Sequence, residues 1–83
     1  MSLDTIRREI DKVDAEILRL LQRRMELAVE SRKYKFEVED TFREDQVISK
    51  VTELSKTYNL DIEFIKRIYQ EIFSESKKRQ LKK

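Results

Sequence analysis

The sequence predicts an all-α protein of three helices, one long and two shorter, that form one domain over residues 1–83. The chain contains no Gly and no Pro, so the turns of a hairpin-rich β fold lack their usual residues. Apolar residues recur three and four positions apart, as they do on one face of a helix. A chain of 83 residues has room for only one small core.

The first predicted helix runs from about Leu3 to about Phe36. Its apolar stripe consists of Leu3, Ile6, Ile10, Val13, Ile17, Leu20, Leu21, Leu27 and Ala28. At 1.5 Å per residue such a helix is about 50 Å long. A compact chain of this size has a radius of gyration of about 12 Å, so a monomer cannot cover the helix.

The second predicted helix follows a break at residues 37–41. Thr41 and Glu44 are three residues apart and predict a capping box that opens a helix from about Phe42 to Thr57. The apolar stripe of this helix is Val47, Val51 and Leu54, with Ile48 at its flank.

The third predicted helix begins after Asn59, which tolerates the left-handed conformation that ends a helix. Asp61 can cap the helix that follows. Its apolar stripe is Ile62, Ile65, Ile68, Tyr69, Ile72 and Phe73, and the helix continues to about Leu81.

Charge and composition exclude several classes of function. The 19 Lys and Arg nearly cancel the 17 Asp and Glu, so no chain-wide basic field indicates nucleic acid, and the basic tail is interpreted as a solvated helix end. The chain contains no Cys, so it can form neither a disulfide nor a thiolate, and no His, which is the commonest metal ligand. We therefore expect neither metal nor cofactor. No apolar run approaches the roughly 20 residues that span a bilayer, and we expect a soluble, cytoplasmic protein.

Polar residues occupy core-facing positions on all three predicted helices. On the first helix, Arg24, Ser31 and Lys35 share the apolar face, and Arg7 lies at its edge. On the second helix, Arg43 shares the apolar face, one turn after Asp40. On the third helix, Ser76 and Gln80 extend the apolar face. Desolvating a charge costs several kcal/mol unless an opposite charge compensates it. These faces therefore predict a shared cationic cavity that binds a small polyanion. The alternatives are that the cations reach solvent past the stripe, and that Ser76 and Gln80 lie in a fraying chain end.

These residues resemble the all-helical chorismate mutases. The resemblance is carried by IRREIDKVDAEILRLLQRRMELAVE at residues 6–30, by D-x-x-R-E at Asp40, Arg43 and Glu44, by N-L-D-x-x-F-I at residues 59–65, and by E-S-x-x-x-Q at Glu75, Ser76 and Gln80. It covers nearly the whole chain. It implies an intertwined homodimer and a cofactor-free Claisen rearrangement of chorismate to prephenate, a step in Phe and Tyr biosynthesis.

The resemblance also implies roles for individual side chains. Arg24 and the second chain's Arg7 would hold the two carboxylates of chorismate, with Arg43 in support. Lys35 and Gln80 would face the ether oxygen, Glu44 would take the substrate hydroxyl, and Asp40 and Ser76 would complete the wall. In this interpretation Lys35, Gln80, Arg24 and Glu44 are the catalytic residues, and all eight bind substrate.

Some positions depart from the family pattern. The connection between the first two helices is short and lacks a Pro, Arg32 stands where a small residue is common, and Ser31 and Lys77 stand where apolar wall residues are usual. Glu44 also has a competing duty in the predicted capping box. Two other functions stay open: an isochorismate pyruvate lyase of the same fold, and a non-catalytic helical dimerisation module.

Overall fold

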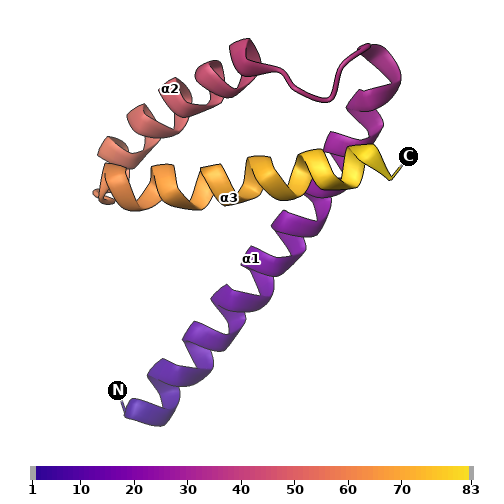
Figure 1. The fold of residues 1–83 in the computed structure, drawn as a ribbon. Coiled ribbons are helices and arrows are strands. Elements are labelled where there is room, and N and C mark those ends of the chain that lie inside the picture. The colour runs from indigo at the N-terminus through magenta and orange to yellow at the C-terminus, as the bar shows by residue number, and fades with distance from the viewer. Residues whose placement is uncertain (1, 83) are drawn as a thin grey trace.

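A computed structural model describes residues 2–82, which form three α-helices and no strand (Figure 1). The helices are α1 (Leu3–Ser31), α2 (Thr41–Thr57) and α3 (Ile62–Leu81), and a short 3-10 turn, η1 (Arg32–Tyr34), follows α1. The predicted all-α class, with one long and two shorter helices, is confirmed. Within residues 2–82 none of the helices has the combination of length and apolar character that crossing a membrane requires.

The first helix ends earlier than the sequence indicated. Ser2 caps its start, because the Ser2 hydroxyl accepts a hydrogen bond from the Thr5 backbone N–H at 3.1 Å. The α-helix stops at Ser31, and the expected end near Phe36 was wrong. Lys35 has extended backbone angles, and its carbonyl oxygen accepts a hydrogen bond from the Arg32 guanidinium at 2.6 Å. This side-chain bond satisfies a carbonyl that can no longer pair within the helix.

The second helix begins with a different cap from the one predicted. Asp40 is the N-cap, and its carboxylate accepts a hydrogen bond from the Arg43 backbone N–H at 3.0 Å. Thr41 is already the first residue of the helix, so the predicted Thr41–Glu44 capping box was wrong. A carboxylate caps better than a hydroxyl here because it also meets the positive end of the helix dipole. The Glu44 side chain is left free to pair elsewhere.

The turn between α2 and α3 follows the prediction. Asn59 has a φ of 55°, which is the left-handed conformation expected for it. The Leu60 backbone N–H donates to the Ser55 carbonyl at 2.8 Å and closes the end of α2. Asp61 caps α3, since its carboxylate accepts from the Phe64 backbone N–H at 3.3 Å.

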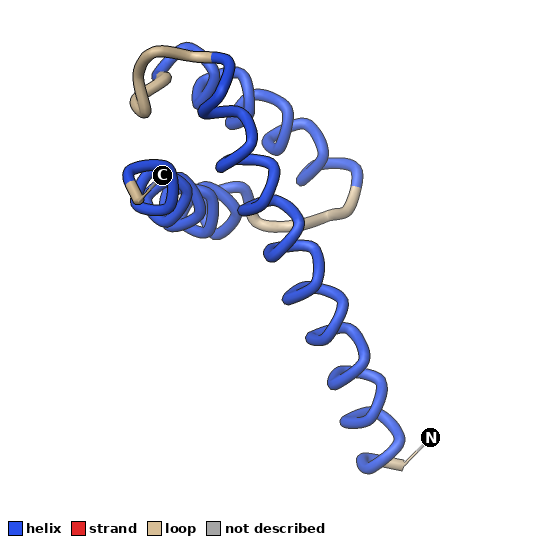
Figure 2. Tube along the Cα trace, turned by 90° about the vertical axis from the view of Figure 1, so that its right-hand side faces the viewer, coloured by secondary structure: helices blue, strands red, loops and turns tan. Residues whose placement is uncertain are grey.

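The helices do not form a closed bundle within one chain. In Figures 1 and 2, α2 folds back on α3, the C-terminal half of α1 crosses α3, and the N-terminal half of α1 projects away from both. The radius of gyration is 15.5 Å and the longest dimension is 52 Å, against about 12 Å for the radius of a compact chain of this length. Only Met25, Ile72 and Phe73 form the buried apolar core of the part described.

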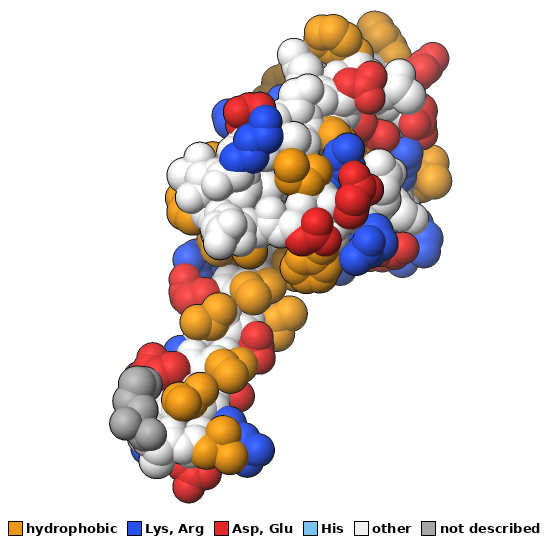
Figure 3. Space-filling model, turned by 90° about the vertical axis from the view of Figure 1, so that its left-hand side faces the viewer, with side chains coloured by type: hydrophobic (Ala, Val, Ile, Leu, Met, Phe, Trp, Pro, Cys, Tyr) orange, Lys and Arg blue, Asp and Glu red, His pale blue; other side chains and the backbone are white. Residues whose placement is uncertain are grey.

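The projecting half of α1 carries a long exposed apolar stripe. Its large apolar side chains are 42–67% exposed: Leu3, Ile6, Ile10, Val13, Ile17, Leu18 and Leu20. Figure 3 shows hydrophobic side chains gathered along this part of the helix. Most of these residues belong to the apolar stripe of the first predicted helix, which we expected to be too long for one chain to cover.

Candidate active site

A cavity of about 300 Å³ lies between the C-terminal half of α1, the loop before α2, the start of α2 and the end of α3. Apart from Arg7, every residue predicted for the site lines it: Arg24, Lys35, Asp40, Arg43, Glu44, Ser76 and Gln80. Ser31 lines it as well. Arg7 lies instead on the exposed, projecting half of α1.

Arg24 is half-buried and faces aromatic rings of α3. The carbon of its guanidinium group lies 5.7 Å from the ring centre of Tyr69 and 5.8 Å from that of Phe73. A cation in this position is attracted by the negative face of the rings. These contacts orient Arg24 while leaving its hydrogen-bond donors available to a ligand.

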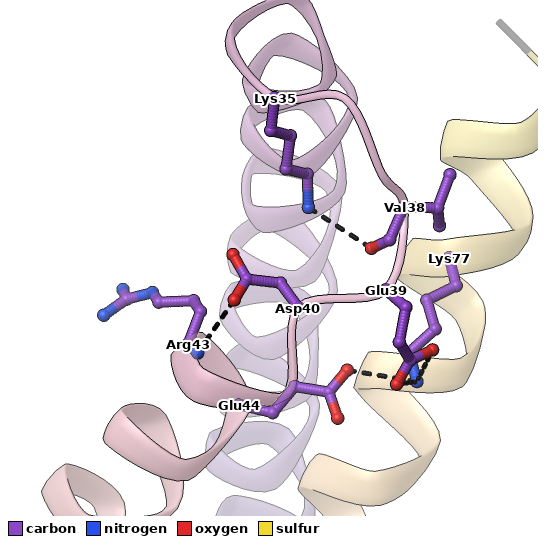
Figure 4. Close-up of polar contacts among 7 residues, drawn as sticks. All are labelled: Lys35, Val38, Glu39, Asp40, Arg43, Glu44 and Lys77. Carbon is purple, nitrogen blue, oxygen red and sulfur yellow. Dashed lines mark hydrogen bonds and ion pairs between the residues drawn. The ribbon is translucent and has the colours of Figure 1, made fainter.

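Lys35 and Arg43 contribute two further cations. The Lys35 ammonium is half-buried and donates to the Val38 carbonyl at 3.3 Å (Figure 4). The Arg43 side chain is more exposed, points away from Asp40 and Glu44 in Figure 4, and lies 3.5 Å from the Gln46 amide oxygen. Within residues 2–82 none of the three cations, Arg24, Lys35 and Arg43, forms an ion pair with a carboxylate.

A fourth cation, Lys77, is paired with protein carboxylates. Its ammonium lies 3.0 Å from a Glu44 carboxylate oxygen and 3.0 Å from one of Glu39. The hydrogen bonds to Glu39 and then Glu44 raise the pKa of Lys77 above its ordinary value. Lys77 was not among the predicted site residues, although its spacing of four from Phe73 and three from Gln80 puts all three on one face of α3.

Ser76 and Gln80 are buried near the end of α3, so the alternative of a fraying chain end was wrong. The Ser76 hydroxyl contacts the Met25 sulfur at 3.5 Å. The Gln80 amide oxygen is buried and has no hydrogen-bond partner in the described part of the chain. An unpaired buried acceptor costs about 1–3 kcal/mol, and only a hydrogen-bond donor can satisfy it. An anion can bind Gln80 only through the amide NH2 group.

Residues 6–81 match the family model described as chorismate mutase type II. The chain belongs to the chorismate mutase type II family. The resemblance inferred from the sequence is thereby confirmed.

Curated relatives of this chain are bifunctional chorismate mutase/prephenate dehydratases. The protein of that name from Buchnera aphidicola subsp. Acyrthosiphon pisum (strain APS) is 36% identical over 79 residues, which cover 90% of this chain and 20% of the relative. The protein from Escherichia coli (strain K12) is 36% identical over 75 residues, which cover 86% of this chain and 19% of the relative. The chain thus spans about a fifth of the length of the curated relatives that it matches.

The chain has a cavity suited to an anion with several polar groups. Three cations without carboxylate partners can bind two carboxylates, and Arg does so with two parallel hydrogen bonds. The Lys35 ammonium and the Gln80 amide can stabilise negative charge on a third oxygen. The described residues contain no group of three or more His, Cys, Asp or Glu side chains placed to hold a metal ion.

Proposed function

We propose that this chain, residues 1–83 acting as one domain, catalyses the rearrangement of chorismate to prephenate. The observation that carries the proposal is the charge of the cavity. Arg24, Lys35 and Arg43 line it without a carboxylate partner in the described chain, beside Gln80, whose amide NH2 group can donate a hydrogen bond to an anion. A dicarboxylate supplies the missing negative charges, and family membership points to chorismate.

Substrate binding would use guanidinium groups from two chains. Arg24 would hold one carboxylate of chorismate and the second chain's Arg7 the other, with Arg43 supporting this region. Bidentate contacts to both carboxylates hold the compact conformer in which the reacting carbons lie close together. Lys77 is already neutralised by Glu39 and Glu44, so it adds little attraction for the substrate.

The chemical step would need no proton transfer and no nucleophile. Within one molecule the ether C–O bond breaks as a C–C bond forms, and atoms are neither gained nor lost. Negative charge grows on the ether oxygen, where Lys35 and Gln80 would donate hydrogen bonds that strengthen in the transition state. Donors of this kind contribute about 10²–10³-fold each to the rate. Glu44 would accept the substrate hydroxyl, and Asp40 and Ser76 would complete the wall.

The active protein would be an intertwined homodimer. The exposed apolar stripe on the projecting half of α1 supports this, because burying it against a second copy removes a large apolar area from water. The small core of a single chain supports it as well, since three buried apolar side chains within residues 2–82 are few for a stable domain of this length. Arg7 lies on the same projecting half, from which it would reach the site of the other chain.

The test is to follow the loss of chorismate by absorbance and to identify the product. Wild type is expected to yield prephenate, and Arg24→Ala or Lys35→Ala is expected to lose most turnover while the helical circular dichroism signal stays intact. Full activity in both variants contradicts the site. Pyruvate with an aromatic acid as product indicates the lyase instead.

The non-catalytic dimerisation module is tested separately. A bicyclic dicarboxylate that mimics the transition state should raise the melting temperature only if the anion cavity forms. Ligand at 100 times its Kd stabilises the folded protein by about 2.7 kcal/mol. No change in melting temperature, together with no turnover, favours the module.

A further inference from the structure

Lys77 makes the ion pairs that join different elements of the fold. Within residues 2–82 every other ion pair links side chains three or four positions apart, within one helix or between a helix and the turn that directly follows it. Lys77, on α3, instead reaches Glu39 in the loop before α2 and Glu44 in the first turn of α2. Figure 4 shows both carboxylates directed at the Lys77 ammonium. This ion-pair cluster of three residues therefore ties α3 to the segment that forms the opposite side of the cavity.

Two of the three side chains in the cluster are less exposed than those of the other ion pairs, while Glu39 is 56% exposed. The Lys77 and Glu44 side chains are 29% and 23% exposed, whereas both partners of each within-helix pair are at least 42% exposed. Exposed pairs contribute little because water and salt screen them. Breaking a pair that is shielded from water is costlier, since it leaves a charge without its partner.

The two carboxylates depend on the one ammonium between them. Glu39 and Glu44 each lie 3.0 Å from the Lys77 nitrogen, so they are brought close to each other by that contact. Without the ammonium these like charges would repel. Glu44 would then leave its place at the cavity, and the loop that carries Lys35 and Asp40 would lose its side-chain tie to α3.

We propose that Lys77 is a positioning residue, which holds the Glu44 carboxylate at the edge of the cavity and, through Glu39, holds the loop before α2 against α3. This inference rests on the proposed function, in which Glu44 accepts the substrate hydroxyl. Lys77 also lines the cavity, but its ammonium is taken up by the two carboxylates. It affects turnover by fixing the position of the Glu44 carboxylate.

The test compares variants of Lys77 with a matched control on the same helix. Lys77→Met keeps an unbranched, slightly shorter side chain and removes the charge. Lys78→Met makes the same change at the next residue, which is exposed and lines no part of the cavity. Lys77→Met is expected to lower kcat for chorismate about tenfold or more, because displaced groups lose rate steeply. KM should rise as well, since the Glu44 contact to the substrate hydroxyl is weakened while Arg24 still binds a carboxylate. Lys78→Met should match wild type.

Two further variants separate positioning from general destabilisation. Lys77→Arg keeps the charge and should retain most of the kcat. Adding Glu39→Gln to Lys77→Met removes the repulsion between the carboxylates, so the double variant should recover part of the lost kcat. A purely structural role gives no recovery. If Lys77→Met does not fold, Lys77→Gln takes its place with the same expectations.

The outcomes also separate this inference from the proposed function. If wild type is active, Arg24→Ala is inactive and Lys77→Met matches Lys78→Met, only the positioning role is overturned. A Lys77→Met defect that Glu39→Gln does not relieve overturns it as well. If wild type leaves chorismate unchanged, the proposed function fails and the positioning role fails with it.

Discussion

Gln80 is predicted to stabilise the transition state while destabilising the free protein. Its side chain is 6% exposed, and its amide oxygen has no partner within residues 2–82. Gln80→Met replaces the amide by an apolar group of similar length, which removes a penalty of about 1–3 kcal/mol for the unpaired atom. For a domain of this size 1 kcal/mol corresponds to about 4–8 °C in Tm. The variant should therefore melt at least 4 °C higher than wild type without ligand.

The same variant should lose activity, because the donor to the ether oxygen is gone. The expected fall in kcat is about 10²–10³-fold. Thermal unfolding is followed by circular dichroism at fixed protein concentration, and kcat by loss of chorismate. Gln70→Met is the control, since Gln70 is an exposed residue of α3. A Gln80→Met protein that melts lower than wild type and keeps its kcat refutes the reasoning on both counts.

Mixing Arg7→Ala chains with Arg24→Ala chains should restore activity, because some heterodimers regain one intact site; no recovery despite proven subunit exchange contradicts the shared site. The free energy of unfolding in urea should differ between wild type and Lys77→Met. This difference, which measures the contribution of Lys77, should depend on pH in the alkaline range. Because Glu39 and Glu44 raise the pKa of Lys77 in the folded state, the contribution is fully present below the ordinary value of 10.5 and is lost as pH rises through the folded value. A difference that is unchanged at a pH well above 10.5 contradicts the ion pairs.

Local signals predicted most of the fold. The bounds of α2 and α3 and the conformation of Asn59 follow from apolar spacing and from side chains that bond to nearby backbone. The two errors lie where local options compete. Asp40 and Thr41 can both cap α2, and the carboxylate takes the position. Beyond the end of α1 the Arg32 side chain bonds to the Lys35 carbonyl, a contact that apolar periodicity does not reveal.

Helical spacing also placed most of the candidate site. Arg24 and Gln80 come from distant parts of the sequence, yet each falls on the apolar face of its helix, and both line one cavity. Lys35 lines the same cavity from extended backbone beyond α1, where helical spacing did not place it. The pairing of Lys77 with Glu39 joins residues 38 positions apart, and no local pattern encodes it. The apolar stripe of α1 is exposed in a single chain. Apolar spacing predicts that this stripe needs a partner surface, but it does not identify the partner.

We propose that cations from two chains hold a dicarboxylate in the cavity between α1, α2 and α3. A crystal structure of the protein with the bicyclic dicarboxylate mimic tests it most directly. We predict one mimic per chain in the cavity, with Arg24 on one carboxylate, the second chain's Arg7 on the other, and Lys35 and Gln80 at the ether oxygen. A mimic bound elsewhere, or a cavity whose Arg24, Lys35 and Gln80 side chains turn to bulk water in the assembled protein, would contradict the account.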